Sequence, residues 1–390
     1  MNLLQGGFGL FLFTVIATVI VMPIGDYSRR VLRRLQVKIH NTLEARIKAD
    51  SPLHLDSFYL FLVKKVLANL RFSAAGAFYV TTITNSGLPF ITAQARLICL
   101  LTSGLGLSQF PLRSIRLIEE LTDALILCKR PNLLYSLNNY ACYPQDEGIA
   151  SVWAGLALIK AYEATGSDRF WQETVSIYDA MLSDLYSKKT GLVHTAGQDF
   201  WCLNASSKFA YLSTLLLKHR RAHLIEDALQ TSITLCLDNI AEDGHFPYTE
   251  EHDGVYILLY HASVMFYLNN CLASECVASH LKDGIRQVNE KALAFLLRCM
   301  DSSGRFMEPE RRSASFYLIS LVTALAALGD RIDQEQHNMI LKNLLMYCHD
   351  DHLFMYIDRN GYLTNRERYR VRDVLAVEAL YWLTQYMLCS

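Results

Sequence analysis

One short stretch of the chain gathers side chains suited to acid–base chemistry. From Asp243 to Leu268 the sequence reads DGHFPYTEEHDGVYILLYHASVMFYL, in which polar and aromatic residues precede an almost wholly apolar segment. A histidine and a tyrosine can act as base and acid in a proton transfer, and a carboxylate can take either role. The candidates for these catalytic roles are His261, Tyr256, Tyr260 and Asp253.

The same kind of junction recurs along the chain. A glycine-centred turn leads into a polar loop, a very apolar segment, a short break and an amphipathic segment. Such turns lie at Gly87, Gly191, Gly244, Gly304 and Gly361. The apolar segments begin near residues 88, 146, 203, 254, 312 and 370, with separations of 58, 57, 51, 58 and 58 residues. A repeat of this length predicts six helical hairpins.

The hairpins contain two classes of helix. Residues 254–268 and 315–328 are apolar around nearly the whole helix, which requires burial on all sides, whereas 285–300 has a single apolar stripe. The first class suits an inner ring and the second an outer ring. A helix within 53–72 precedes the first inner helix, and the last inner helix ends near Leu388. Residues 53–390 are therefore predicted to form an all-α, closed toroid of six inner and six outer helices.

This architecture resembles the (α/α)6 toroids. They include six-hairpin glycosidases, toroidal polysaccharide lyases, uronyl epimerases and the more distant terpene and lanthionine cyclases. The segment DEGIASVWAGLALIKAYEATGSDRFWQETV, from Asp146, is similar to a hairpin of the sugar-processing members. The resemblance covers residues 53–390 and implies a site at one rim of the ring. Fold alone does not determine function.

The predicted rim is formed by the amino ends of the inner helices, which carry partial positive charge and favour anionic ligands. The candidates for substrate binding are Trp201, Asn204, Tyr248, Arg311, Arg312, Arg366, Tyr369 and Arg372. Arginine and asparagine can neutralise a carboxylate, and the aromatic side chains can stack on sugar rings. The same aromatic residues could instead plug the mouth of the ring. Other rim positions include Gln94, Arg96, His194, His245 and Glu308.

Two chemistries are compatible with these residues. Glycoside hydrolysis requires two facing carboxyl groups, which Asp146 or Glu147 could form with Asp253 or Glu308. Asp146, Glu147 and Asp253 also suit helix capping. Proton abstraction beside a uronate carboxylate, as in lyases and epimerases, requires a neutraliser, a base and an acid. The histidine, tyrosines and arginines of the rim supply these types.

The first residues have the features of a membrane anchor. Leu3 to Met22 carries no charge and is long enough to cross a bilayer, and five basic residues lie between Arg29 and Lys38. The predicted anchor is 1–24, followed by a basic amphipathic segment at 25–52. The basic flank favours a single-pass protein of the inner membrane with its larger domain in the cytoplasm. A membrane-protein partner is compatible with this placement.

Composition excludes several classes of function. The net charge of −1 gives no electrostatic basis for nucleic-acid binding. The ten cysteines form no CxxC pair, and we expect buried, reduced thiols and no metal site. The chain has neither a phosphate-binding glycine-rich loop nor a GxSxG motif, so no cofactor is expected.

These features together predict a membrane-anchored toroid that acts on an acidic glycan in envelope polysaccharide metabolism. The enzymatic alternatives are a uronate lyase, an epimerase or a glycoside hydrolase. The other alternative is a catalytically silent toroid that binds a glycan, a lipid-linked saccharide or a partner protein as a scaffold.

Overall fold

The computed structural model describes residues 55–73, 76–79, 91–104, 114–136, 147–250, 257–307, 316–349, 352–353, 356–357, 363–364 and 372–389. The predicted anchor at 1–24 and the basic segment at 25–52 lie outside these residues. Within the described part of the chain, no helix combines the length and the apolar character needed to cross a bilayer.

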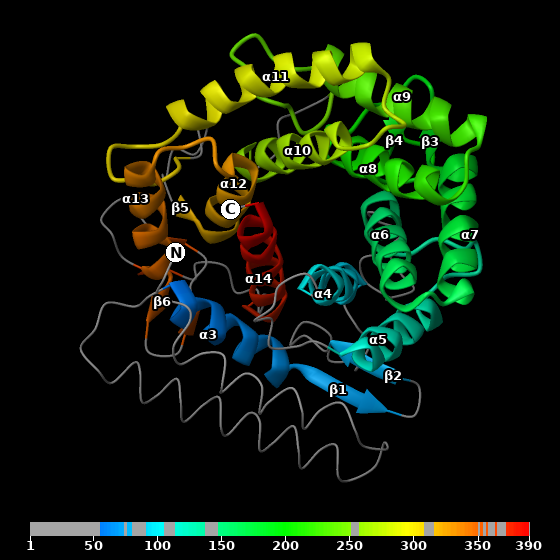
Figure 1. Ribbon diagram of the computed structural model, residues 1–390, viewed down its shortest axis with the longest axis horizontal. Helices are drawn as coiled ribbons and strands as arrows, with labels where there is room; N and C mark the ends of the chain where they lie inside the picture. Colours follow the sequence, from blue (N-terminus) through cyan, green and yellow to red (C-terminus); the bar gives the residue numbers. More distant parts are fainter. Residues whose placement is uncertain are drawn as a thin grey trace.

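Six helices form an inner ring (Figure 1). They are α4 (Ile91–Gly104), α6 (Glu147–Thr165), α8 (Leu203–His219), α10 (Ile257–Leu272), α12 (Leu318–Leu328) and α14 (Arg372–Cys389). Each packs against the next in this order, and α14 packs against α4. The ring therefore closes between its first and last members, as predicted.

The outer helices alternate with the inner ones along the chain. They are α3 (Leu55–Ala68), α5 (Ile115–Leu127), α7 (Asp168–Asp184), α9 (His223–Asp238), α11 (Ser279–Arg298) and α13 (Gln334–Leu345). The first of them, α3, packs against the last inner helix, α14. A hydrogen bond between the Tyr59 and Thr384 hydroxyls, 3.2 Å apart, joins these two helices.

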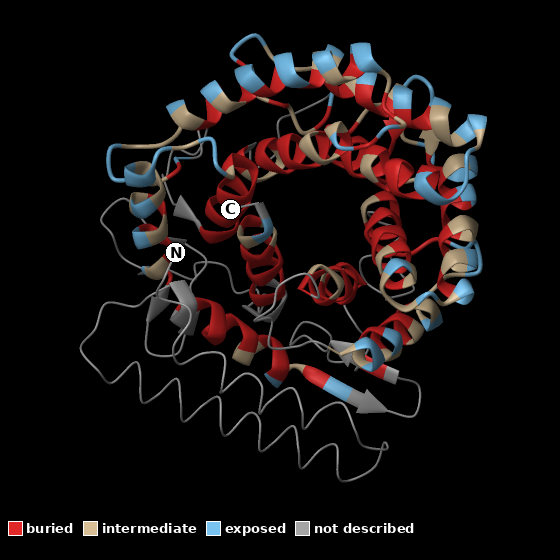
Figure 2. Cartoon of the chain, viewed as in Figure 1, coloured by how far each residue is buried: buried red, intermediate tan, exposed pale blue. Residues whose placement is uncertain are grey.

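The burial pattern explains the two classes of helix (Figure 2). Every residue of α12 is buried, because both its inward and its outward faces meet other helices. The amphipathic α11 instead buries one stripe, which includes Leu281, Ile285 and Leu296, and exposes its charged face. Apolar burial at about 25 cal/mol per Å² supplies the main driving force for this packing.

The glycine turns repeat in detail. At Gly244 the backbone N–H of Ala241 donates to His245 O at 2.9 Å, and at Gly304 that of Asp301 donates to Arg305 O at 2.8 Å. Gly191, Gly244 and Gly304 have φ of 63°, 93° and 79°, a region that glycine adopts without steric cost. A Cβ on Gly244 would also lie 2.5 Å from Lys291 O. The turns thus dock each hairpin against its neighbour.

The architecture is not wholly α-helical. Short antiparallel strands occupy segments that precede inner helices, and one of them pairs with a strand that precedes the next inner helix. They are β1 (Leu70–Ser73) with β2 (Gly76–Tyr79), β3 (Tyr186–Ser187) with β4 (Gly191–Leu192), β5 (Phe316–Tyr317) with β8 (Tyr356–Ile357) and β9 (Leu363–Thr364), and β6 (Cys348–His349) with β7 (His352–Leu353). These pairs were not predicted, since strands of two to four residues leave no hydrophobic period to recognise.

Candidate functional site

His261 lies on the outward side of α10, against α11. Its Nδ1 accepts a hydrogen bond from the Phe246 N–H at 3.0 Å, and its Nε2 donates to Ala292 O at 3.0 Å. The side chain is fully buried, and desolvation lowers its pKa to about 3. Because both ring nitrogens bind backbone, His261 has no lone pair for a ligand inside the ring. We therefore assign it a structural role in place of the predicted catalytic one.

Tyr260 belongs to a different cluster. Its ring stacks on that of Tyr248, with centroids 4.0 Å apart and planes inclined by 18°. The Tyr248 hydroxyl lies 3.0 Å from His194 Nε2, and Cys202 Sγ lies 2.9 Å from the same nitrogen. With the imidazole proton on Nδ1, both the phenol and the thiol can donate to Nε2. His194 and Tyr248 therefore form a histidine–tyrosine pair of the predicted kind, with different members.

Backbone pairing positions this cluster. Cys202 and Thr249 form an antiparallel bridge, and the Leu203 N–H donates to Tyr248 O at 3.2 Å. The segment before α8 is thereby fixed to the segment before α10. The Gly148 N–H donates to His194 O at 2.7 Å, which ties the start of α6 to the same place.

Glu147, the first residue of α6, is buried and forms an ion pair with Arg130. A carboxylate at the first turn of a helix is also stabilised by the helix dipole. Its arginine comes from the segment after α5, so the pair joins two consecutive hairpins. This contact accounts for Glu147 structurally.

Two predicted binding residues lie near the start of α8. Trp201 is partly buried, and its backbone carbonyl accepts from the Glu250 N–H at 3.3 Å. Asn204 is buried in the first turn of the helix. Arg372 begins α14, although the description does not extend to its side chain. The other predicted site residues lie outside the described residues: Asp146, Asp253, Tyr256, Arg311, Arg312, Arg366 and Tyr369.

An ion pair further along the inner helices joins the first of them, α4, to the last, α14. Arg96 of α4 and Glu378 of α14 meet at 2.9 Å between Nη2 and Oε1, with side chains 14% and 12% exposed. The Arg96 guanidinium also lies over the Trp153 ring of α6, 4.8 Å from its centroid. This cation–π contact and the ion pair hold Arg96 between three inner helices.

Lys208 of α8 is a buried cation near this pair. Its Nζ donates to Asn204 O at 3.0 Å and to Ser263 Oγ at 2.9 Å, and it lies 5.0 Å from the centroid of the Tyr267 ring. Desolvation, together with the Arg96 charge, lowers the pKa of Lys208 to about 7. Its amine can therefore gain or lose a proton near neutral pH.

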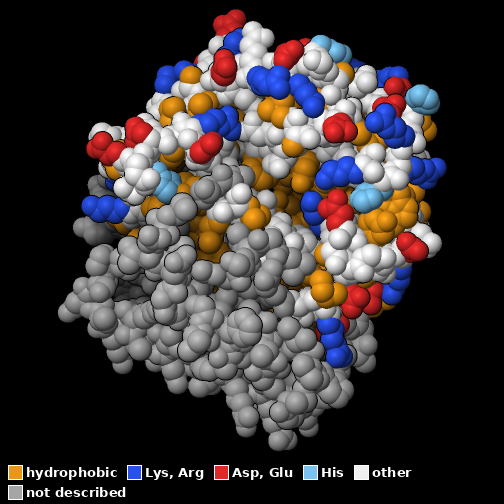
Figure 3. All heavy atoms as spheres, viewed as in Figure 1, with side chains coloured by type: hydrophobic (Ala, Val, Ile, Leu, Met, Phe, Trp, Pro, Cys, Tyr) orange, Lys and Arg blue, Asp and Glu red, His pale blue; other side chains and the backbone are white. Residues whose placement is uncertain are grey.

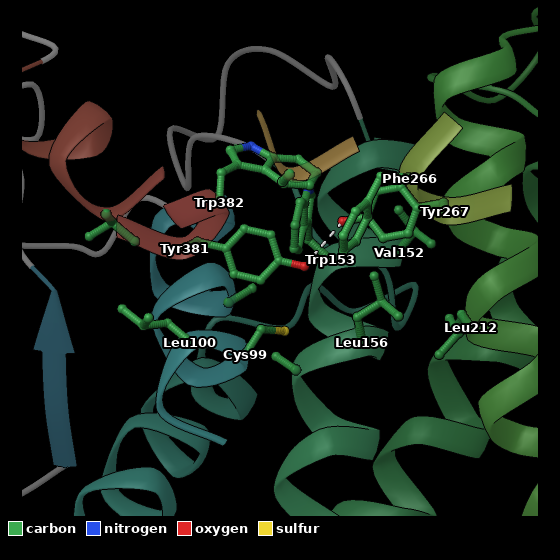
Figure 4. Close-up of a cluster of buried hydrophobic side chains, with 14 of the residues drawn as sticks. Cys99, Leu100, Val152, Trp153, Leu156, Leu212, Phe266, Tyr267, Tyr381 and Trp382 are labelled. Atoms are coloured by element: carbon green, nitrogen blue, oxygen red, sulfur yellow. Dashed lines mark hydrogen bonds between the residues drawn. The ribbon is translucent and has the colours of Figure 1, made fainter. Parts of the chain in front are cut away.

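Aromatic side chains from several inner helices pack together in the buried core of the toroid (Figure 4). Trp153 of α6 makes edge contacts with Tyr267 of α10 and Tyr381 of α14, at centroid distances of 6.3 and 5.4 Å. None of these helices neighbours another in the ring, so their side chains meet across the axis. Trp382 packs against Tyr381 at 5.1 Å. On the face drawn in Figure 3, hydrophobic side chains gather near the middle, inside a border of charged ones.

The sequence does not predict a role for Lys208, Glu378 or Trp153, and it predicts Arg96 only as a rim position. A usable signal was present. Arg96 and Lys208 each lie five residues after the first residue of an inner helix, and Glu378 lies six after. At 1.5 Å per residue this places all three about 8 Å along their helices. Isolated charges at matching depths in apolar helices indicate a shared polar layer.

The described residues contain no group of three or more histidine, cysteine or acidic side chains arranged to hold a metal ion. Seven cysteines whose side chains are described are free thiols, and four of these are buried.

Comparison with known proteins identifies the fold. No protein-family model and no curated protein matches the sequence. Solved structures do match. A cellobiose 2-epimerase of Bacillus thermoamylovorans is similar with a TM-score of 0.62 and 9% identity, covering 84% of this chain and 99% of that one.

Two further solved structures are also similar to this chain. A sugar epimerase from a ruminal bacterium has a TM-score of 0.61 and 9% identity, over 83% of this chain and 98% of its own. A glycoside hydrolase family 76 mannosidase of Bacteroides thetaiotaomicron has a TM-score of 0.61 and 10% identity, over 86% of this chain and 99% of its own. At these identities the likeness establishes the fold, an (α/α)6 toroid.

Proposed function

We propose that the chain acts on a carbohydrate by proton transfer, as an epimerase or a lyase, at the amino ends of α6, α8 and α10. The observation that carries this proposal is the His194–Tyr248 pair, 3.0 Å apart, beside the stacked Tyr248 and Tyr260 rings. When the sugar displaces the Tyr248 hydroxyl and the Cys202 thiol from His194 Nε2, the imidazole can take a proton from a sugar carbon and the phenol can return one. The imidazolium then passes its proton to the phenolate, which restores the pair. The aromatic stack offers a flat surface for a sugar ring.

The fold supports a carbohydrate substrate, because two of the similar structures are sugar epimerases and a third is a mannosidase. Hydrolysis is the second reaction to consider. It requires two carboxyl groups that face one glycosidic bond. Of the described carboxylates at the inner ring, Glu147 is bound by Arg130 and Glu378 by Arg96. Among the described residues, the ion pairs that hold Glu147 and Glu378 favour proton transfer over hydrolysis.

Incubation of the full chain with reducing disaccharides and uronic-acid oligosaccharides in D₂O tests the reaction. An epimerase removes a carbon-bound proton and returns a solvent deuteron, so deuterium appears in the sugar by NMR and mass spectrometry. A lyase forms a C=C bond with ultraviolet absorbance, and a hydrolase releases new reducing ends. His194→Gln and Tyr248→Phe should each reduce deuterium incorporation at least about 100-fold, the range for removal of a catalytic acid or base.

His280→Gln is the matched control, because His280 lies on the exposed face of α11. It should retain full activity. New reducing ends with neither deuterium incorporation nor ultraviolet absorbance would assign hydrolysis instead and contradict the proposed reaction.

A silent, ligand-binding toroid is supported by one observation, the burial of Trp153, Tyr267 and Trp382 across the axis. Rings that close the depth of the toroid leave less room for a substrate. Sugar binding by calorimetry without any of the three reactions favours this alternative.

We further propose that residues 3–22 anchor the protein in the inner membrane with residues 53–390 in the cytoplasm. The support is the uncharged run and its basic carboxyl-terminal flank. Reporter fusions to the carboxyl terminus test the sidedness: an active cytoplasmic reporter is expected, and an active periplasmic reporter contradicts it.

A further inference from the structure

Three buried N–H donors at the axis of the ring have no hydrogen-bond partner among the described residues. They are Arg96 Nε, Trp153 Nε1 and Trp382 Nε1. The Asn204 Oδ1 acceptor is also buried and has no hydrogen-bond partner among the described residues. Each buried, unpaired polar group costs about 1–3 kcal/mol, and folded proteins contain few of them. The described residues hold ten buried side-chain atoms of this kind, and these four lie on inner helices, where a ligand would supply the missing partners.

Lys208 adds an unbalanced charge at this place. Among the described residues its amine binds only the uncharged Asn204 carbonyl and Ser263 hydroxyl, and it forms no ion pair. The nearby carboxylate, Glu378, is taken up by Arg96. With Lys208 protonated, the charges of Arg96 (+1), Lys208 (+1) and Glu378 (−1) sum to +1. A buried charge of this kind is stabilised by an anionic partner.

We propose that this layer binds the carboxylate of an acidic sugar, with Lys208 supplying the opposite charge and Arg96 and Trp153 donating hydrogen bonds. The inference rests on the proposed function, that the ring binds a sugar, and it names the class of sugar. The Arg96 and Glu378 side chains are 14% and 12% exposed, so this ion pair lies next to solvent, whereas Lys208 and Trp153 are buried behind it. Asn204 Oδ1 is placed to accept from a sugar hydroxyl.

The charge of the layer favours a carboxylate over a phosphate. A carboxylate carries one negative charge and matches the net charge of +1. A phosphate monoester carries about −1.5 to −2 near pH 7, which leaves excess negative charge in a desolvated site. Neutral sugars satisfy the unpaired N–H donors but leave the Lys208 ammonium without a counter-ion.

The affinity should depend on pH through Lys208. The charged or titratable groups that influence its amine are Arg96, Glu378, Cys202 and Cys236. Because the pKa of Lys208 is about 7 in the unliganded protein, the ammonium is present at pH 6 and largely lost at pH 9. Affinity for a carboxylate should therefore fall as the pH rises, whereas affinity for a neutral sugar should not.

Calorimetric titration of the full chain with D-glucuronate, D-glucose and D-glucose 6-phosphate tests the inference. Glucuronate should bind at least about tenfold more tightly than glucose at pH 6, which corresponds to one charge-assisted hydrogen bond. Lys208→Met should remove this preference. Trp153→Phe keeps an aromatic ring but removes the N–H donor, and it should weaken glucuronate binding about threefold to tenfold.

Lys188→Met is the matched control, because the Lys188 side chain is 79% exposed on the outer surface. It should bind all three sugars as the unaltered chain does. Equal binding of glucuronate and glucose overturns the inference, and tighter binding of glucose 6-phosphate than of glucuronate also overturns it. Both results leave the proposed function unaffected. Binding of no sugar, including the oligosaccharides used above, overturns both. A preference that persists in a folded Lys208→Met variant also overturns the inference.

Discussion

At the scale of the residue, adjacent side chains on one helix have opposite roles. Tyr260 stacks on Tyr248 beside the candidate acid–base pair, whereas His261 points outward and fastens the Gly244 turn to α11. The distinction follows from the 100° rotation between successive helical residues. Chemistry can therefore be assigned to a residue only after its direction is known.

Replacement of His261 by alanine should lower the free energy of unfolding by about 3 kcal/mol, because the Phe246 N–H and the Ala292 carbonyl each lose a buried partner. His280→Ala, on the exposed face of α11, should change it by less than about 0.5 kcal/mol. Urea denaturation followed by circular dichroism measures both. A His261→Ala variant as stable as His280→Ala would contradict the structural role.

The contribution of His261 should also depend on pH. Its pKa falls from 6.5 to about 3 on folding, so the unfolded chain binds the extra proton first. The stability that the neutral imidazole contributes is complete above pH 6.5 and is lost as the pH falls toward 3. Denaturation between pH 7 and 4 should therefore show the difference between the unaltered chain and His261→Ala narrowing. A difference that is constant across this range contradicts the neutral, buried state.

At the scale of the element, the start of α6 holds the segment that carries His194. Gly148 lies so close to this segment that an added Cβ would stand 1.9 Å from Val193 O. Neither side of this contact can move easily, because one is a helix backbone and the other is bonded to it through His194 O. The position of the proposed base thus depends on a glycine.

Gly148→Ala should destabilise the fold by about 2–4 kcal/mol and displace His194. Gly284→Ala on α11 is the matched helical control, since its Cβ would meet only the movable Cδ1 of Leu237, at 2.7 Å. There the better helix propensity of alanine, worth about 1 kcal/mol, offsets the contact. Chemical denaturation compares the two variants, and equal stabilities would contradict the close approach at Gly148.

The helices could be predicted from the sequence, but the direction of their side chains could not. The repeat and the two classes of helix placed the start of α8 at residue 203 and that of α6 within one residue. An inner helix that is apolar all round has no polar face, so nothing indicates which side meets the axis. For this reason the sequence predicts His261 at the rim, and it does not show that Lys208, one of several buried polar residues of α8, lies near the axis.

At the scale of the whole molecule, closure of the ring brings together residues from its two ends. Arg96 and Glu378 meet only because α14 packs against α4, and Gln385 Nε2 donates to Ser103 Oγ at 3.2 Å across the same contact. An open array of hairpins would leave these groups apart. The polar layer that we assign to the sugar carboxylate is thus a product of closure.

Double-mutant analysis of Arg96 and Glu378 tests this closure. Glu378→Leu or Arg96→Met alone should cost about 3 kcal/mol, because the partner charge stays buried and unpaired, and the double variant Arg96→Met/Glu378→Leu should recover much of the loss. The exposed pair Arg286–Asp283 on α11 is the control, with coupling below about 0.5 kcal/mol. Strictly additive losses at Arg96 and Glu378 would show that the two ends do not meet.

The most direct measurement is a crystal structure of the full chain with a bound glucuronate-containing oligosaccharide. A sugar ring is expected against Tyr248 and Tyr260, within reach of His194, and a carboxylate is expected beside Lys208 and Arg96. A sugar bound on the outer surface of the toroid, with the axis still closed by Trp153 and Tyr267, would contradict a site inside the ring.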